Sequence, residues 1–349
     1  ITTYVALALA RQRSIFNVGV MFAAGVGDGK IILFYGLQRK NFICTHLMRY
    51  PHLITQESRQ GARQLIAATR EKGIVSISHV EARRAALTNP KQAIRQIAGN
   101  GALRHPFLLI ERFRNWRWLH RHLRSDIPKQ PFILFLMHLQ PEASTASQAP
   151  RWVDQDRVIE QLAINAPQGM QIVVKENPQC FGWRGERYYG RLADLGNVHF
   201  AHPLVPTNEL LRCAQALVTI TGSAGVEAIL LGTRVAVLGR PYYAEFHGVR
   251  LLDAPEQVFA ELNDASWKND AEQHCETYIA AYLQSLHEIG DVTPGRKWPA
   301  PEVMGPKFAD AVRRTLTFIE THRLTPAQFT AGLGLQRAAK PSLLQLVES

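Results

Sequence analysis

The sequence has few cysteines, and none of them lie close together. Its four cysteines, Cys44, Cys180, Cys213 and Cys275, form no Cys-x-x-Cys pair. This spacing argues against a zinc knuckle or a disulfide framework and favours the reducing cytoplasm as the protein's location. No apolar run reaches the roughly 18–20 residues of a membrane span. The apolar stretch at residues 4–10 precedes its arginines, which is the wrong order for a secretory signal.

Several catalytic motifs are also missing. The sequence contains no G-x-x-x-x-G-K-[ST] phosphate loop, no H-E-x-x-H zinc motif and no G-x-S-x-G nucleophile turn. It has no clustered set of metal ligands either. We therefore expect chemistry that needs no metal ion and no resident cofactor.

Basic residues outnumber acidic residues in the sequence. The 40 lysines and arginines exceed the 29 aspartates and glutamates and give a net charge of +11. A positive field of this size favours anionic partners such as phosphorylated substrates, acidic polymers, nucleic acid or an acidic membrane surface. No nucleic-acid recognition motif accompanies the charge, so we expect no nucleic-acid partner.

The densest basic and aromatic stretch lies between Arg112 and Arg124. Arginines interleaved with tryptophans suit a helix that lies on an anionic membrane surface, or a groove for a negatively charged glycan. A helix between two domains, with its apolar face on a core and its arginines in water, explains the same pattern equally well.

The C-terminal half alternates short apolar runs with helical patterns. Strands are expected at residues 132–139, 171–174, 198–201, 216–220 and 235–238, and helices at 153–166, 184–195, 208–216 and from 224. This alternation predicts a parallel sheet that is covered on both faces. Ligands of such sheets bind beyond the carboxyl ends of the strands.

The N-terminal half is less regular. Strands are expected at residues 18–23, 30–35, 42–47, 74–78 and 107–110, and helices at 60–71 and 80–98. At this length two α/β domains are expected, one over residues 1–125 and one over 126–300. A proline-rich connector leads to a helix at 307–322, within a final segment of 301–349.

A strand, a turn of small residues and a helix follow one another between residues 218 and 232. The turn consists of Thr221, Gly222, Ser223, Ala224 and Gly225. A helix N-terminus presents unpaired N–H groups and partial positive charge, and small residues let an anion approach the backbone. The acid of this helix, Glu227, lies about one turn in, where it can accept hydrogen bonds from sugar hydroxyls. The pattern indicates a nucleotide or nucleotide-sugar site, although a plain structural turn explains it as well.

Polar side chains also follow the strand that ends near residue 138. Glu142 can act as general base toward an acceptor hydroxyl, and His138 can bind phosphate or orient that acid. Gln140 lies between them and is expected on the donor side. The structural alternative is that Pro141 fixes a turn and nearby hydroxyls bond to the backbone.

Two further loops follow strands of the same sheet. Lys175 can neutralise a nucleotide phosphate, Glu176 can serve as acid, base or hydroxyl acceptor, and Asn177 is expected beside the donor. Tyr243 can stack on a base or a sugar. A surface ion pair and a packed aromatic ring are the respective structural alternatives.

Together these segments resemble the bacterial capsule polysaccharide biosynthesis family. Its elements are a Leu-His-x-Gln-Pro-Glu-x-Ser loop, an Asp-Gln pair, a Val-Lys-Glu-His-Pro segment, a Thr-Gly-Ser/Thr-x-Gly-x-Glu-Ala turn and a Gly-x-Pro-Val closure. The corresponding segments here are residues 136–144, 154–155, 174–178, 221–228 and 232–235. Two positions differ, because Asn177 stands where the family has histidine and Arg234 where it has proline.

The resemblance implies a GT-B architecture, in which two Rossmann-like domains with parallel sheets face a central cleft. Better-understood relatives transfer Kdo from CMP-Kdo onto lipid-linked capsule precursors, without a metal. It further implies that Ser223 and the backbone of residues 222–225 bind the donor phosphate, with help from Lys175. Glu227 would hold the ribose and Glu142 would be the base. The expected protein is a cytoplasmic glycosyltransferase at the inner membrane, with a nucleotide-sugar epimerase or a non-catalytic polysaccharide assembly protein as alternatives.

Overall fold

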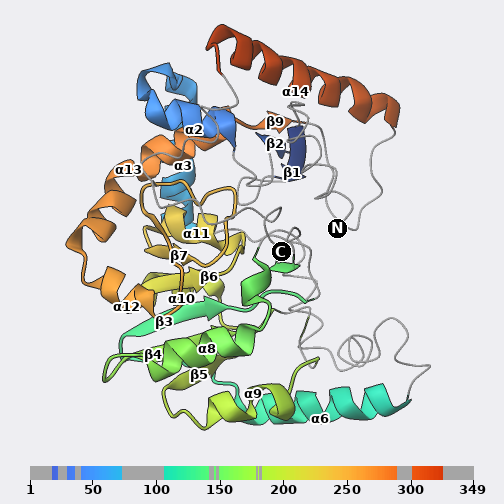
Figure 1. Cartoon of the computed structure of the whole chain (residues 1–349), viewed down its shortest axis with the longest axis vertical. Coiled ribbons are helices and arrows are strands. Elements are labelled where there is room, and N and C mark those ends of the chain that lie inside the picture. The colour runs from blue at the N-terminus through green and yellow to red at the C-terminus, as the bar shows by residue number, and fades with distance from the viewer. Residues whose placement is uncertain are drawn as a thin grey trace, which may run out of the picture.

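The computed structural model covers the chain in several stretches (Figure 1). The described residues are 18–22, 30–35, 41–72, 106–140, 145–146, 149–177, 180, 183–288 and 301–324. The strand expected at 74–78, the helix expected at 80–98 and the candidate base Glu142 lie outside these residues.

The largest element is a six-stranded sheet in the order β5-β4-β3-β6-β7-β8, in which every pair is parallel. Its strands are β3 (Phe132–Leu136), β4 (Gln171–Lys175), β5 (Val198–Ala201), β6 (Ala216–Thr219), β7 (Val235–Val237) and β8 (Val249–Leu251). The first five match the apolar runs of the sequence. The parallel sheet predicted for the C-terminal half is therefore confirmed, and β8 adds an edge strand that the sequence pattern did not reveal.

Helices cover both faces of this sheet, because successive side chains of a strand point to opposite sides. Leu134 of β3 packs toward α10 (Thr207–Cys213) and α11 (Ala224–Leu231). The next residue, Phe135, faces the core beneath α8 (Gln155–Ile164), α9 (Glu186–Ala193) and α12 (Gln257–Leu262). Burial on both faces explains why the strands read as continuous apolar runs.

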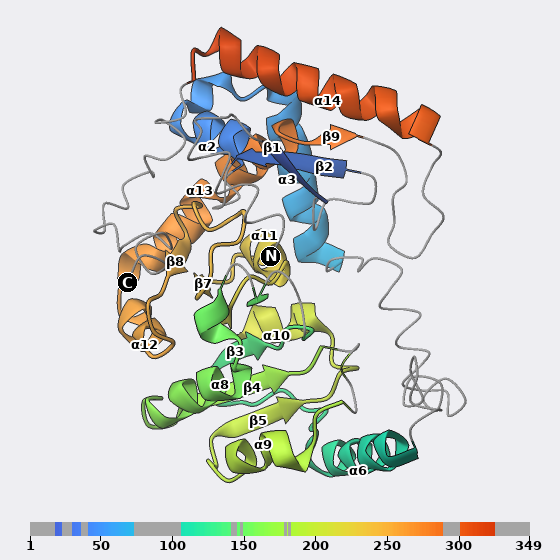
Figure 2. The same ribbon diagram turned by 45° about the vertical axis from the view of Figure 1, so that its right-hand side comes forward.

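A smaller antiparallel sheet lies at the other end of the molecule (Figure 2). It pairs β1 (Val18–Phe22), β2 (Lys30–Tyr35) and β9 (His287–Glu288), and α14 (Pro301–Thr321) crosses above it. The α/β class and the Rossmann-like C-terminal sheet are as expected. The described strands of the N-terminal half, in contrast, pair antiparallel rather than forming the second parallel sheet that was expected.

Two predicted strands of the N-terminal half are helices. Residues 42–47 form most of α2 (Phe42–Arg49), because the Asn41 side chain caps the helix by accepting from the Cys44 N–H at 3.1 Å. Residues 107–110 open α6 (Pro106–His122). Both runs are short and apolar, so their periodicity could not separate strand from helix.

Helix α13 (Ala265–Gln284) connects the two ends of the molecule. It leaves the edge of the large sheet and packs against α3 (Gln56–Lys72) and α2. Helix α11 also packs against α3, and at its C-terminal end the Leu230 carbonyl accepts from Arg70 Nε at 3.3 Å.

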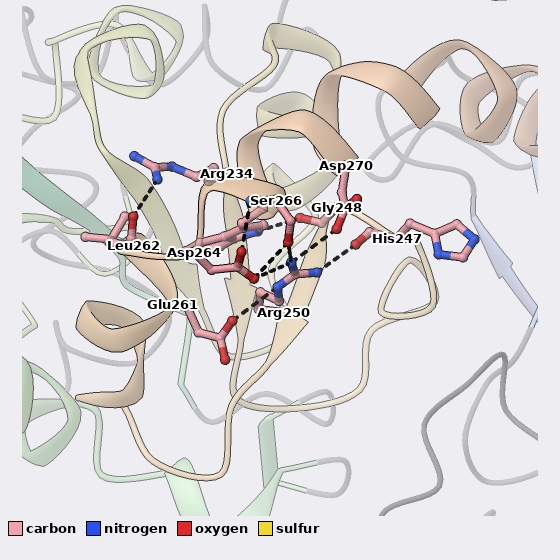
Figure 3. A network of polar contacts seen from close by, with 10 residues as sticks. Arg234, His247, Gly248, Arg250, Glu261, Leu262, Asp264, Ser266 and Asp270 are labelled. Atoms are coloured by element: carbon pink, nitrogen blue, oxygen red, sulfur yellow. Dashed lines mark hydrogen bonds and ion pairs between the residues drawn. The ribbon is translucent and has the colours of Figure 1, made fainter.

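An ion-pair network fixes the N-terminal end of α13 (Figure 3). The guanidinium of Arg250, on β8, contacts the carboxylates of Glu261, Asp264 and Asp270 at 3.2, 3.3 and 3.2 Å. It also lies over the ring of Trp267 at 6.0 Å. One arginine thereby joins the edge strand to α12 and α13, which holds the sheet's edge without contributing to its carboxyl rim.

Candidate functional site

Loops from four neighbouring strands bond to one another at the carboxyl edge of the large sheet. They follow β3, β4, β5 and β6, which lie side by side in the sheet. The contacts described below link the first loop to the fourth and the second to the third. Parallel strands place their carboxyl ends at one edge of the sheet, so these loops share one rim.

His138, at the end of β3, is buried and shapes the turn after β6. Its Nε2 accepts from the N–H groups of Ile220 and Thr221 at 3.3 and 3.4 Å. A ring nitrogen that accepts from backbone N–H carries no proton, so the Thr219 hydroxyl, 3.1 Å away, donates to it. The same hydroxyl oxygen accepts from the Gly222 N–H at 3.2 Å. His138 thus positions the turn.

Gly225, in the turn, makes room for Tyr243. The Tyr243 side chain is 0% exposed, and its hydroxyl donates to the carbonyl of Gly222. A Cβ atom on Gly225 would lie 2.2 Å from the Tyr243 hydroxyl oxygen. The expectation that Tyr243 stacks on a ligand is wrong, because a ring without exposed surface cannot reach a base or a sugar.

Substituting Gly225 with alanine is expected to destabilise the protein by at least about 3 kcal/mol, since its Cβ would overlap a buried ring. Chemical denaturation monitored by circular dichroism measures this loss. Gly190→Ala is the matched control, because its Cβ would meet no atom closer than 3.9 Å. In the middle of α9 that control should be neutral or slightly stabilising. Equal stability of the two variants would contradict the packing role.

The N-terminus of α11 has open hydrogen-bond donors. Ser223 is exposed, and its hydroxyl does not cap the helix. The N–H groups of Ser223 and Ala224 donate to no residue that the structure describes, whereas those of Gly225 and Val226 are paired within the turn. The hydroxyl oxygen of Thr221 is buried and has no hydrogen-bond partner among the described residues. Open donors at a helix N-terminus are what an anion requires.

Lys175 is buried at the end of β4. Its ammonium donates to the carbonyl of Val205, in the loop after β5, at 2.6 Å and to the hydroxyl of Thr207, the first residue of α10, at 2.8 Å. Burial lowers the pKa of Lys175 to about 8, and the negative charge of Glu227 acts in the opposite direction. The side chain is therefore mostly protonated at neutral pH and has a third N–H for an anion.

Glu227, in the first turn of α11, is a carboxylate that the protein leaves unsatisfied. It accepts no hydrogen bond from any described residue, and the residue is half-buried. Burial raises the pKa of Glu227, and the charge of Lys175 lowers it in part. A half-buried carboxylate beside a lysine, without a donor among the described residues, can accept hydrogen bonds from the hydroxyl groups of a ligand.

Glu176 is fully engaged with the protein. One carboxylate oxygen accepts from Arg184 Nη1 and from the Asn177 N–H, both at 2.8 Å, and the other accepts from the Tyr189 hydroxyl. Arg184 also donates a hydrogen bond from Nη2 to the side-chain oxygen of Gln140 at 3.2 Å. This arrangement argues against the expected role of Glu176 as acid, base or hydroxyl acceptor. It makes the Glu176–Arg184 pair a brace between the loops after β3 and β4.

Sequence reasoning missed three residues of the rim. Arg184 forms the brace, Thr207 holds Lys175, and Gln155 pairs with the His138 backbone at both its N–H and its carbonyl, at 2.7 and 3.2 Å. Gln155 stood in a segment that resembles the family, but nothing local showed its partner. Arg240, just beyond the end of β7, is exposed and makes no contact described for this rim.

The described residues contain no group of three or more His, Cys, Asp or Glu side chains that could hold a metal ion. Among them, no helix has the length and apolar character needed to cross a membrane.

Comparison with known families agrees with the segments named in the sequence. Residues 120–271 match the family of capsule polysaccharide biosynthesis proteins. This range contains the whole rim described above, and the resemblance to the family is thereby confirmed for this part of the chain. No curated protein matches the sequence.

Solved structures with some likeness include two transferases and an epimerase. Thermosulfurimonas dismutans KpsC, a beta Kdo 2,7 transferase, is 13% identical over 86% of this chain and 82% of that chain, with a TM-score of 0.45. A putative UDP-N-acetylglucosamine 2-epimerase from Listeria monocytogenes is 16% identical over 47% of each chain, with a TM-score of 0.33. The spinosyn rhamnosyltransferase SpnG is 17% identical over 46% of each chain, also with a TM-score of 0.33.

Proposed function

We propose that the chain is a glycosyltransferase of capsular or related surface-polysaccharide synthesis, acting from the cytoplasmic side of the membrane. It would transfer a sugar from a nucleotide donor to a glycan or lipid-linked acceptor. The main support is the unpaired carboxylate of Glu227 beside Lys175 and the open N–H groups of α11. These groups lie on the carboxyl rim of a parallel sheet, where ligands of such sheets bind.

Each part of the donor has a matching group in this proposal. The phosphate accepts hydrogen bonds from the N–H groups of Ser223 and Ala224 and from the ammonium of Lys175. The ribose hydroxyls donate to Glu227. Asn177, on the neighbouring loop, can add a neutral hydrogen bond where the family's histidine would stand.

The proposed reaction is a displacement at the anomeric carbon. An acceptor hydroxyl oxygen forms the new bond to that carbon while the bond from the carbon to the donor phosphate oxygen breaks. The electron pair stays on the phosphate, whose charge Lys175 and the α11 N-terminus stabilise. The proton of the acceptor hydroxyl passes to a carboxylate base, for which Glu142 is the candidate. No step in this scheme requires a metal ion.

The donor itself is a further part of the proposal. By resemblance to the family, CMP-Kdo is the first candidate, and the neutral Asn177 makes other nucleotide sugars worth testing beside it. The acceptor is proposed to be a lipid-linked or free glycan.

Binding and turnover with a panel of CMP-, UDP- and GDP-sugars test the function, in the presence and absence of EDTA. We expect one nucleotide class to bind and its sugar to be released or transferred, with no loss of rate in EDTA. An isomerised sugar nucleotide formed without acceptor would instead indicate an epimerase. Absence of both binding and turnover with every donor would leave only a non-catalytic role in polysaccharide assembly.

A further inference from the structure

Helix α6 exposes large apolar side chains along one face. Phe107, Ile110 and Phe113 are 83%, 59% and 54% exposed. Their spacing of three residues places them on the same side of the helix. Isolated exposed apolar residues are normal on a protein surface, but three consecutive members of one helix face form a patch, and patches mark interaction sites.

The same face continues with cations. Arg114, Arg117 and Arg121 are all exposed, and they follow the apolar residues at helical spacings of three and four. Glu111 is the single acidic residue of the helix. The exposed face is therefore apolar in its first half and strongly basic in its second half.

The opposite face anchors the helix firmly. Leu119 is buried in the core of the large domain, and Trp118 stacks on the ring of Tyr189 at a centroid distance of 6.1 Å. Both views show α6 along the outer edge of the domain beside α9, at the opposite end of the molecule from α14 (Figures 1 and 2). The exposed face thus stands on a rigid element and points away from the two-sheet body.

Trp183, on the loop before α9, packs on the anchored side of α6. The Trp183 ring lies under the guanidinium of Arg112 at 5.3 Å, and its backbone carbonyl accepts from the Asn115 side chain at 3.2 Å. Arg112 and Asn115 stand seven and four residues before the buried Leu119, on the same side of the helix, so Trp183 helps to fix α6 and is not part of the exposed face.

The helix is tied to the candidate site through the backbone. Directly after α6, the Arg124 N–H donates to the carbonyl of Phe200 at 2.8 Å, and the Arg124 carbonyl accepts from the His202 N–H at 2.7 Å. The loop that begins at His202 contains Val205 and leads to Thr207, and these two residues hold Lys175. The C-terminal end of α6 therefore lies near the rim at which the donor phosphate is proposed to bind.

We propose that the exposed face of α6 docks the protein on an anionic phospholipid bilayer. The inference rests on the proposed function in one respect, since a lipid-linked acceptor would reach the rim from that bilayer. Phe107, Ile110 and Phe113 enter the headgroup boundary, and the arginines pair with lipid phosphates. A nucleic acid or an acidic glycan would account for the arginines alone, whereas lipid accounts for the apolar residues as well.

Vesicle flotation of the full chain tests the proposal, using phosphatidylcholine vesicles with and without phosphatidylglycerol. The wild-type protein should float mainly with the anionic vesicles. The triple variant F107S/I110S/F113S should lose at least about tenfold in partitioning. The variant R114Q/R117Q/R121Q should lose its preference for anionic lipid. Because all six side chains are exposed, neither variant should change the far-UV circular dichroism or the melting temperature.

The matched control removes exposed apolar residues from other helices of the same chain. The double variant I164S/V303S changes side chains that are similarly exposed, on α8 and α14. It should float like the wild type. Donor binding in the absence of vesicles should be unchanged in all three variants, which separates a failure of docking from a failure of the proposed function.

Three outcomes would overturn the docking surface. One is equal flotation of wild type and the apolar triple variant. Another is a concentration-dependent dimer in solution that the triple variant abolishes, because the face would then bind a second copy of the chain. The third is arginine-dependent binding of soluble polyanions with no contribution from the apolar residues.

Discussion

Replacing Glu227 with glutamine is expected to lower the kcat/KM of sugar transfer by about a hundredfold. Hydrogen bonds to a charged group contribute about 1.5–3 kcal/mol each, and this carboxylate has no protein partner that already uses it. Glutamine keeps the size of the side chain but removes the charge and one of the two acceptor oxygens. Nucleotide titration calorimetry should show most of this loss as weaker donor binding.

Glutamate at the start of a neighbouring helix provides the control for this substitution. Glu209 is an exposed acid in the first turn of α10, and Glu209→Gln should leave transfer unchanged. Burial raises the pKa of Glu227 above its unfolded value, so its ionised form opposes folding once the pH exceeds that unfolded value. Glu227→Gln should therefore be at least as stable as the wild type at neutral pH. A loss of activity accompanied by unfolding would contradict a ligand-binding role.

Replacing Lys175 with methionine is expected to weaken nucleotide binding by about a hundredfold, because a buried cation next to a phosphate is removed. The wild type should itself lose affinity as the pH rises through about 8, where Lys175 gives up its proton. The Lys175→Met variant should show no such fall. Calorimetric titration of CMP and UDP from pH 6.5 to 9.5 measures both effects, and a flat wild-type profile would contradict the assignment.

The same lysine makes a pH-dependent contribution to stability. Its pKa is lowered from 10.5 to about 8 in the folded protein, so the unfolded chain binds the proton more tightly. The buried ammonium therefore destabilises the folded state by roughly 3 kcal/mol below pH 8, and this destabilisation disappears above pH 10.5. The unfolding free energy of wild type, relative to Lys175→Met, should rise between these two pH values. The exposed Lys268→Met control should show no such trend.

The C-terminal sheet could be read from the sequence because its signals are local. β3 is an uninterrupted apolar run, β4 and β6 each contain three consecutive apolar residues, and each strand is followed by a helical pattern. Strands buried on both faces have no polar side, so such runs identify them. The turn before α11 was equally legible, since small residues and an early glutamate stand together.

The N-terminal half could not be read in the same way. Residues 42–47 carry no clear period, and the cap formed by Asn41 decides in favour of α2. Strand β2 pairs with β9, whose residues lie about 250 positions later in the chain. No local pattern contains information about a partner so distant in the chain.

Side-chain roles show the same division. Lys175 and Glu176 are neighbours in the sequence, and both were candidates for chemistry. The structure places the first beside Glu227 and surrounds the second with Arg184 and Tyr189. Which of the two remains open to a ligand depends on α9, which no motif connects to β4.

By itself, the sequence determined that a parallel sheet has a turn of small residues and an acid at its carboxyl edge, because buried strands and helix starts show as patterns of adjacent residues. The tertiary structure alone decided that His138 shapes that turn, that Tyr243 is core and that Glu176 is a brace. These roles arise from contacts between segments far apart in the chain, where packing and hydrogen-bond saturation assign each side chain its partner.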